Sequence, residues 1–316
     1  MTGKVELVSF VEDTLSLLEV NATESRTELT SDVALGSLLV QCQRQVEILK
    51  TTQVTPLRVV HHFACSGGTL ITRALACQPN TMVLSEVDPF SSNARVSTGF
   101  APSDLIHLAR NNRNPPSQKT IVDMFLQQLE VLYKATDQRG ENLVVRDHSH
   151  SHFCEFSDLS SRPTMGSMLA SRFETRAILS VRHPLDSYMS LRRNGWARNL
   201  TGTLEGYANC YLSFLDSYRA PQIFHYEHFV QEPDVECKRM AECLELPFEP
   251  RWQDFLPTIK LSGDSGRSSP RITARSRRDV PDTIKEQLMK GCRSYHALCD
   301  RLNYNPDPDA PAVVVT

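Results

Sequence analysis

The sequence lacks the features that mark nucleic-acid-binding, membrane-spanning and secreted proteins. Its 34 lysines and arginines are outnumbered by 37 aspartates and glutamates, which argues against general nucleic-acid binding. No apolar run approaches the ~20 residues of a membrane-spanning helix, so we expect no membrane span. The nine cysteines form no CxxC pair, and the N-terminus has no signal-peptide pattern. We therefore expect reduced cysteines and a cytoplasmic location.

Lysine is also missing where a nucleotide-binding chain most often has it. Residues 66–69 read Ser-Gly-Gly-Thr between an apolar run and a helical pattern, and no lysine lies between Lys50 and Lys119. The glycines let the backbone turn tightly around an anion, and the N–H groups that begin the next helix favour negative charge. Ser66 and Thr69 add hydroxyl donors. These residues predict a phosphate-binding loop, although a plain glycine turn fits them as well.

The missing lysine narrows the choice of phosphate donor. An ATP-using loop has the pattern GxxxxGK[ST], in which the lysine holds the terminal phosphates. Magnesium-assisted phosphoryl transfer from ATP is therefore disfavoured. A donor whose phosphate is bound by a glycine-containing loop without this lysine fits the sequence better than ATP does.

Short apolar runs alternate with helical patterns through most of the chain. The runs cover residues 57–63, 81–87, 142–148, 176–183 and 221–229. Helices are expected from Gly68, over 118–136, after Pro184, over 204–218 and over 283–302. This alternation predicts an α/β fold with three layers, in which a parallel sheet has helices on both faces. Ligands bind at the carboxyl ends of such strands, and each motif discussed here lies at such an end.

The two ends of the chain read differently from this central part. Apolar residues repeat every three to four positions in the first fifty residues, which predicts a helical N-terminal extension over 1–55. Pro56 closes it, because proline discourages a helix from continuing. The sequence NPDPDAPAVVVT predicts a frayed C-terminal tail over 306–316. The main domain is therefore expected over 56–305.

A second anion-binding pattern lies in the stretch VRHPLDSYMS. Arg182 and Ser190 lie eight residues apart across a strand-to-helix turn, with Pro184 and Asp186 suited to the first helical turn. The arrangement can aim a guanidinium and a hydroxyl at a second phosphate, remote from the first. An ordinary capped helix with a surface arginine accounts for the same residues.

Together the two patterns resemble the paired nucleotide sites of the sulfotransferases that use 3′-phosphoadenosine 5′-phosphosulfate (PAPS). In that family an S-G-x-T loop holds the 5′-phosphosulfate and a later R-x-P-x-D-x-x-x-S element holds the 3′-phosphate. The resemblance implies a P-loop sulfotransferase domain in which Cys65, Ser66, Gly67, Gly68 and Thr69 contact the 5′ end of PAPS. It implies that Arg182 and Ser190 bind the 3′-phosphate, and that the product is adenosine 3′,5′-bisphosphate (PAP).

Cys65 departs from the family pattern, which usually has Lys or Arg before the Ser-Gly pair. Arg73 or Arg146 could supply the missing positive charge, or catalysis could be weak, or the chemistry could differ. If activity has been lost, the chain is a regulatory protein that binds PAP and transfers nothing. A third family element, a basic loop that closes over the nucleotide, resembles residues 262–278, and Arg267 is its nearest match.

Two residues are candidates for the base that takes a proton from the acceptor. His148 follows Arg146 and Asp147 at the end of one run, which resembles the catalytic histidine of soluble sulfotransferases. Glu86 ends another run, and other branches of the family use a glutamate there. We favour His148 because an imidazole already titrates near neutral pH. The acceptor is expected to be a hydroxyl or amine of a small molecule or carbohydrate, bound by residues 88–117 and 149–170.

Alternate histidines raise a different possibility. His148, His150 and His152 would share one face of an extended segment and could ligate zinc, as in a zinc-dependent hydrolase. Further ligands could come from His183, His225 or Glu227. No spacing in the sequence requires this arrangement, and the sulfotransferase interpretation needs no metal.

Overall fold

The computed structural model describes residues 55–91, 104–154, 159–219, 221–261, 272–274 and 276–314, together with Val40 and Gln43. The predicted extension over 1–55 therefore lies almost wholly outside the described residues, and so does Arg267. The described residues from Pro56 onward belong to one compact unit.

Five parallel strands of this unit form one sheet in the order β2-β3-β1-β4-β5. The strands are β1 (Leu57–His62), β2 (Thr81–Val87), β3 (Asn142–Asp147), β4 (Thr175–Val181) and β5 (Gln222–His225). β1 lies in the middle, where Val59 is level with Val145 of β3 and Ala177 of β4. Every residue of β1 is buried, as expected for a strand covered on both faces. The predicted α/β fold is confirmed.

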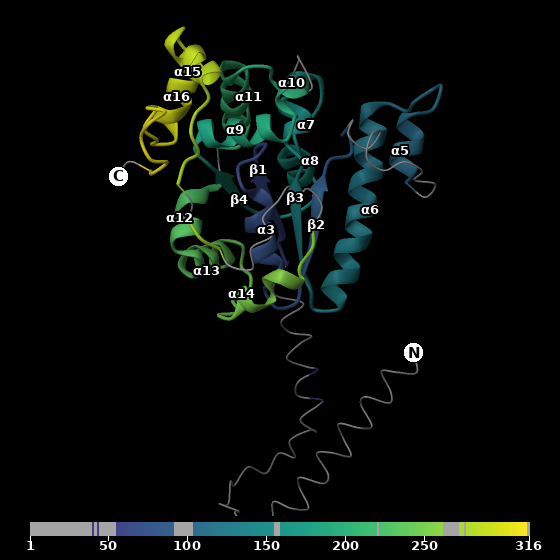
Figure 1. Ribbon diagram of the computed structural model, residues 1–316. Coiled ribbons are helices and arrows are strands. Elements are labelled where there is room, and N and C mark those ends of the chain that lie inside the picture. Colours follow the sequence, from purple (N-terminus) through teal and green to yellow (C-terminus); the bar gives the residue numbers. More distant parts are fainter. Residues whose placement is uncertain are drawn as a thin grey trace, which may run out of the picture. The chain divides into compact units, whose positions relative to one another are not determined.

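Helices cover both faces of the sheet (Figure 1). Their bounds are α3 (Gly68–Ala76), α5 (Leu105–Arg110), α6 (Gln118–Gln138), α7 (His150–Phe153), α8 (Met165–Ala170), α9 (Pro184–Arg193), α10 (Ala197–Leu200), α11 (Leu204–Ser217), α12 (Tyr226–Gln231), α13 (Pro233–Cys243), α14 (Trp252–Phe255), α15 (Asp282–Met289) and α16 (Arg293–Arg301), with short 3₁₀ turns η1 (Leu159–Ser161) and η2 (Leu256–Thr258). Among these described helices, none has both the length and the apolar content that crossing a membrane requires.

The core follows the period-two alternation of the strands. Val60 packs in a cluster with residues of α3, α12 and α13. Its neighbour Val59 points to the other face and packs with residues of α6 and α8. On that same face, Leu179 of β4 joins residues of α9, α11 and α16. The three clusters give the layered arrangement that the sequence predicts.

Two predicted elements are wrong at their boundaries. The run 221–229 is predicted to be extended, but β5 ends at His225 and helix α12 begins at Tyr226. The single helix predicted over 283–302 is two helices, α15 and α16. Gly291 lies between them with φ +94°, a left-handed conformation in which a helix cannot continue.

The C-terminal residues are held in place rather than frayed. Arg277 donates hydrogen bonds to the carbonyl oxygens of Asp307, Pro308 and Ala310 at 2.6–3.2 Å. Its guanidinium also forms an ion pair with Asp186 in the first turn of α9. The prediction of a frayed tail is therefore wrong for the described residues up to Val314, because a buried arginine binds their carbonyls.

Candidate active site

The carboxyl ends of the parallel strands place the predicted residues at one edge of the sheet. The 63–67 turn follows β1, Arg182 follows β4, and His148 follows β3. Glu86 lies one residue before the end of β2, which pairs with β3. Because β3, β1 and β4 are neighbours, segments more than a hundred residues apart in the chain meet here.

Neighbouring rings explain the two glycines of the predicted phosphate loop. Gly67 has φ +90°, and a Cβ there would lie 2.7 Å from Cε2 of Tyr226 and closer still to its Cδ2. A Cβ on Gly68 would lie 2.7 Å from Cδ2 of His62 and closer still to its Cγ. Only glycine fits at either position while these rings keep their places. The two glycines are therefore required by the packing of these rings against the start of α3.

The hydroxyl of Ser66 orders the turn from inside. Ser66 is fully buried, and its Oγ donates to the carbonyl oxygen of Phe63 at 2.8 Å. Thr69, in the first turn of α3, is half-buried. The hydroxyl of Ser66 is therefore already engaged by the protein.

Cys65 brings no charge to the loop. Its φ of +60° is left-handed, and Nδ2 of Asn194 lies 4.0 Å from its Sγ. Burial raises the pKa of the Cys65 thiol, while Ser190 and Arg182 act in the opposite direction. The thiol is therefore protonated at neutral pH. Ser190 and Arg182, which belong to the second predicted anion-binding pattern, lie close to it.

Arg182 lies against the loop rather than apart from it. Its Nη1 is 3.5 Å from the carbonyl oxygen of Cys65, and its guanidinium stacks 4.7 Å from the ring centre of Tyr226. The side chain of Arg182 therefore lies beside the loop, and its binding of a second phosphate stays a prediction. The ring of Tyr226 lies beside Gly67 and presents the face on which Arg182 stacks.

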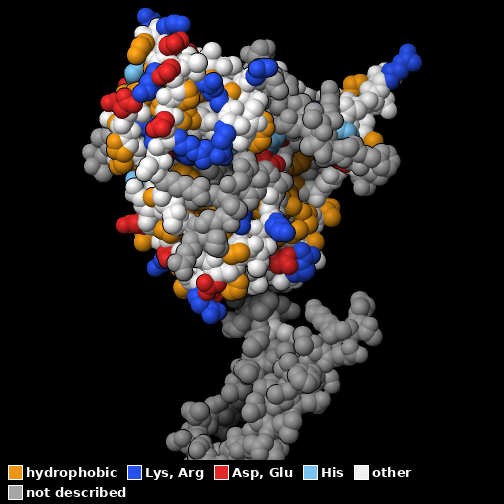
Figure 2. All heavy atoms as spheres, viewed as in Figure 1, with side chains coloured by type: hydrophobic (Ala, Val, Ile, Leu, Met, Phe, Trp, Pro, Cys, Tyr) orange, Lys and Arg blue, Asp and Glu red, His pale blue; other side chains and the backbone are white. Residues whose placement is uncertain are grey.

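Basic side chains surround this edge. Helix α9 ends with the exposed residues Arg192 and Arg193. Figure 2 shows Lys and Arg side chains gathered on the surface over α9. An anion that approaches the carboxyl edge of the sheet from this side meets positive charge.

The two candidate bases are in contact. Glu86 has φ +58° at an irregularity in the pairing of β2 with β3, which turns its side chain toward β3. Arg146 is fully buried, and its Nη2 donates to Oε1 of Glu86. Nε2 of His148 lies 3.3 Å from the other carboxylate oxygen, Oε2, which makes no hydrogen bond with the described residues.

Ser91 fixes the other side of the His148 ring. Its Oγ lies 3.1 Å from Nδ1 of His148. Two arginines hold the turn that precedes it: Arg162 binds both carboxylate oxygens of Asp88, at 2.7 and 2.9 Å, and Arg110 binds the carbonyl oxygens of residues 89–91. The imidazole is thus positioned by this turn, and its ring also packs edge-on against His150 of α7, with ring centres 3.9 Å apart.

Only one of the two candidate substitutes for the missing lysine lies on this side of the molecule. Arg73 donates from Nη2 to the carbonyl oxygen of Leu256 in η2, at 2.7 Å, so its guanidinium is turned away. Arg146 lies close to His62, the ring beneath Gly68. Burial lowers the pKa of His62 to about 3, and the charge of Arg146 acts in the same direction. Arg146 is therefore the candidate near the loop.

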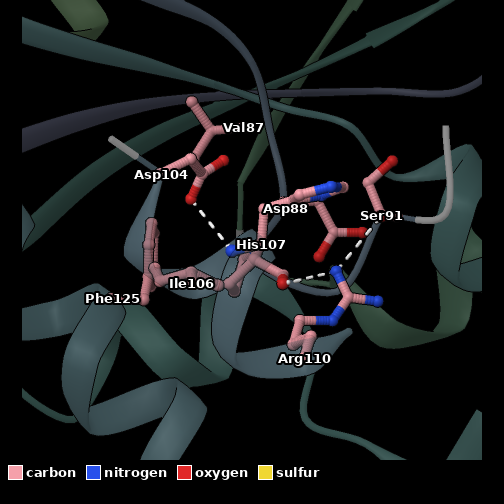
Figure 3. A pocket seen from close by; sticks show the side chains of 9 residues that line it. Val87, Asp88, Ser91, Asp104, Ile106, His107, Arg110 and Phe125 are labelled. Atoms are coloured by element: carbon pink, nitrogen blue, oxygen red, sulfur yellow. Dashed lines mark hydrogen bonds between the residues drawn. The ribbon is translucent and has the colours of Figure 1, made fainter. Parts of the chain in front are cut away.

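A pocket of about 170 Å³ opens beside Ser91 (Figure 3). Apolar walls come from Val87, Ile106 and Phe125, and polar groups come from Asp104 and His107. Part of the predicted acceptor region lies outside the described residues, at 92–103 and 155–158. Since Ser91 contacts both the pocket and His148, the pocket adjoins the candidate base.

The histidine run does not form the predicted extended face. Residues 150–153 form helix α7, and Nε2 of His152 lies 3.2 Å from the carbonyl oxygen of Leu159. The ring nitrogens of His183 and His225 likewise contact backbone carbonyls. In the part of the chain that the structure describes, Glu86, His148 and His150 are the group close enough to share a metal ion.

Two contributors to the site are not predicted by the sequence. Tyr226 falls in a segment predicted to be a strand, which gives no reason to expect its ring beside Gly67. Ser91 lies within the predicted acceptor region 88–117, but no pattern marks it as a partner of His148. A position directly after a strand is the available signal for Tyr226, since carboxyl ends of strands line such sites.

No protein-family model matches the chain, and no curated protein matches it. In structure, the chain is similar to the sulfotransferase domain of the olefin synthase from Synechococcus PCC 7002, with 14% identity and a TM-score of 0.46 over 80% of this chain and 97% of that one. It is also similar to the sulfotransferase domain from the curacin biosynthetic pathway (16% identity, TM-score 0.45, 80% and 99% covered). A third similar structure is a sulfotransferase from Alicyclobacillus acidocaldarius (16%, 0.36, 65% and 91%).

Proposed function

We propose that this chain is a sulfotransferase that moves a sulfuryl group from PAPS to a hydroxyl or amine of a small-molecule or carbohydrate acceptor. The observation that supports this best is the contact between the two predicted anion-binding motifs, in which Arg182 lies against Cys65. A pair of anion-binding motifs that touch at one sheet edge suits a single nucleotide with phosphates at both ends of its ribose. A capped helix with a surface arginine gives no reason for this contact.

Each of the two anion-binding motifs is proposed to hold one end of the nucleotide. The amide groups at the start of α3 and the hydroxyl of Thr69 would hold the 5′-phosphosulfate, aided by the helix dipole. Arg182 and Ser190 would hold the 3′-phosphate. Tyr226 positions Arg182 by stacking. Arg267 is proposed to cover the nucleotide.

His148 is proposed as the general base and Glu86 as its partner. In the tautomer of His148 that has its proton on Nδ1, this nitrogen donates to Oγ of Ser91 and Nε2 can accept a proton. The acceptor oxygen or nitrogen attacks sulfur, the bond from sulfur to the bridging phosphate oxygen breaks, and PAP leaves. The acceptor proton passes to Nε2, where the carboxylate of Glu86 at 3.3 Å stabilises the imidazolium. Arg146 holds Glu86 in place.

Calorimetric binding of PAP to the purified chain tests this proposal. PAP should bind more tightly than AMP or ATP, and Arg182→Ala should weaken PAP by about ten- to a hundredfold. This is the effect of losing a charged hydrogen bond worth roughly 1.5–3 kcal/mol. Arg192→Ala, which removes an exposed charge farther along α9, is the matched control. Equal affinities for PAP and AMP would reject the donor site.

Cys65 supports a second candidate, a PAP-binding regulator without transfer activity. Its uncharged thiol lies where a cation is expected to stabilise the leaving phosphate. Cys65→Lys distinguishes the two candidates, since a chain that has lost only this charge should gain turnover. If the wild type turns over and the variant is no faster, Arg146 is a sufficient substitute.

A further inference from the structure

Two buried atoms beside the proposed base lack the partners that buried polar atoms need. Oε2 of Glu86 and Nδ1 of His150 are buried and make no hydrogen bond with the described residues. Together with His148, the two residues offer ligand atoms that all lie within 4.8 Å of one another. Unpartnered buried acceptors are costly, and a bound cation satisfies them at once.

We propose that Glu86, His148 and His150 form a zinc-binding site. Zinc takes two histidines and a glutamate in sites that leave a fourth position open, with ligands about 2.0–2.1 Å from the metal. Tetrahedral ligands at that radius are roughly 3.3 Å apart. Nε2 of His148 and Oε2 of Glu86 are 3.3 Å apart and make no hydrogen bond, which is the spacing of two ligands across one ion.

Groups around the cluster support its ligand atoms. Arg146 donates to Oε1 of Glu86, so Oε2 remains for the metal. Ser91 holds Nδ1 of His148, which is the outer contact that a metal-binding histidine usually makes and which leaves Nε2 as the ligand.

Arg146 sets the strength of the site. Its charge cancels that of Glu86, so a divalent ion enters a cluster without net negative charge. The site therefore binds zinc more weakly than a structural site does, and zinc exchanges with solution. Zinc on Nε2 occupies the atom that the proposed reaction uses as a base, so it inhibits sulfuryl transfer reversibly. This last consequence rests on the proposed function, whereas zinc binding itself does not.

Titration of zinc into the chelator-treated full-length chain, followed by calorimetry, tests the site. We expect one zinc per chain, and His150→Gln should weaken zinc at least tenfold, since even outer contacts to a metal site are worth about 10–100-fold. His152→Gln is the matched control, because its Nε2 contacts Leu159 and lies outside the cluster. A stoichiometry below ~0.1, or equal zinc affinity in His150→Gln and wild type, would overturn the proposal.

PAP binding by the same samples separates this proposal from the proposed function. If zinc binds as expected and PAP does not, the sulfotransferase proposal fails and the zinc site stands. If PAP binds and zinc does not, the reverse holds. Where both bind, zinc should inhibit PAPS-dependent transfer by the wild type, and a tenfold higher zinc concentration should be needed for His150→Gln. Equal inhibition of the two would place the inhibitory zinc elsewhere.

Discussion

Replacement of Gly67 by alanine should destabilise the protein for two separable reasons. The φ of +90° lies in the left-handed region, which costs an L residue roughly 1–2 kcal/mol. The new Cβ would also lie 2.7 Å or less from ring atoms of Tyr226, which is 8% exposed and has little room to move. Overpacking of this kind costs about 1–3 kcal/mol. We expect a total loss of about 2–5 kcal/mol in the free energy of unfolding.

A double-mutant cycle in urea separates the two terms. Tyr226→Ala removes the ring, so in the double variant Gly67→Ala should cost only its backbone strain. The coupling energy should then be about 1–3 kcal/mol. Gly291→Ala is the matched control, because Gly291 has φ +94° and a Cβ added there would meet no described neighbour within 4 Å. The free energy of unfolding of Gly291→Ala should therefore fall only by the cost of backbone strain.

The outcome that would refute this reasoning is additivity. If Gly67→Ala and Tyr226→Ala sum to the double variant within ~0.5 kcal/mol, the ring does not require glycine at position 67. A Gly67→Ala cost equal to that of Gly291→Ala leads to the same conclusion. If the coupling is found, the affinity of Gly67→Ala for PAP can be measured as well. Because Arg182 stacks on Tyr226, this affinity shows how far the position of Arg182 depends on that ring.

Three further predictions concern charge. Burial above all lowers the pKa of His62 to about 3 and of His183 to about 4, against ~6.5 in the unfolded chain. Between these values the unfolded chain binds protons that the folded chain does not, so stability should fall below pH ~6.5 by about 1.4 kcal/mol per pH unit for each histidine. Urea unfolding from about pH 7 to 5 measures the slope, which His62→Gln should reduce. A flat profile would contradict the neutral, buried state of both rings. Arg277→Met should cost roughly 3–5 kcal/mol, since it leaves buried Asp186 unpaired, and should release the C-terminal residues to proteases. Lys285→Ala, which breaks the more exposed pair with Asp309, should do neither. Arg73→Ala should leave PAP affinity unchanged in calorimetry, because the guanidinium of Arg73 binds Leu256. A tenfold loss of PAP affinity would show that Arg73 contributes to the nucleotide site.

Local patterns predict the elements well where one periodicity is unbroken. The fully buried run of β1 and the Gly68 and Pro184 helix starts are determined by neighbours in sequence. The boundary at Tyr226 escapes prediction because FHYEHF suits a strand and a helix alike. The break at Gly291 escapes it because an isolated glycine is tolerated within a helical pattern.

The site is harder to predict than the fold, because its contacts join different strands. Glu86 and His148 are alternatives in the sequence, and nothing local indicates that an irregularity in β2 turns one toward the other. The contact of Arg182 with Cys65 depends on Tyr226, whose own place the sequence mispredicts. Strand order decides such contacts, and single-sequence patterns do not give strand order.

The central position of β1 also affects synthesis of the chain. β1 pairs with β3 and β4, which begin at Asn142 and Thr175. At about 5–20 residues per second, a nascent β1 waits on the order of ten seconds before its second partner emerges from the ribosome. During that interval its apolar faces and both of its edges are exposed, which is the condition that favours intermolecular pairing. Fragments that end before residue 181 should therefore aggregate, and expression of the chain should depend on factors that shield nascent strands.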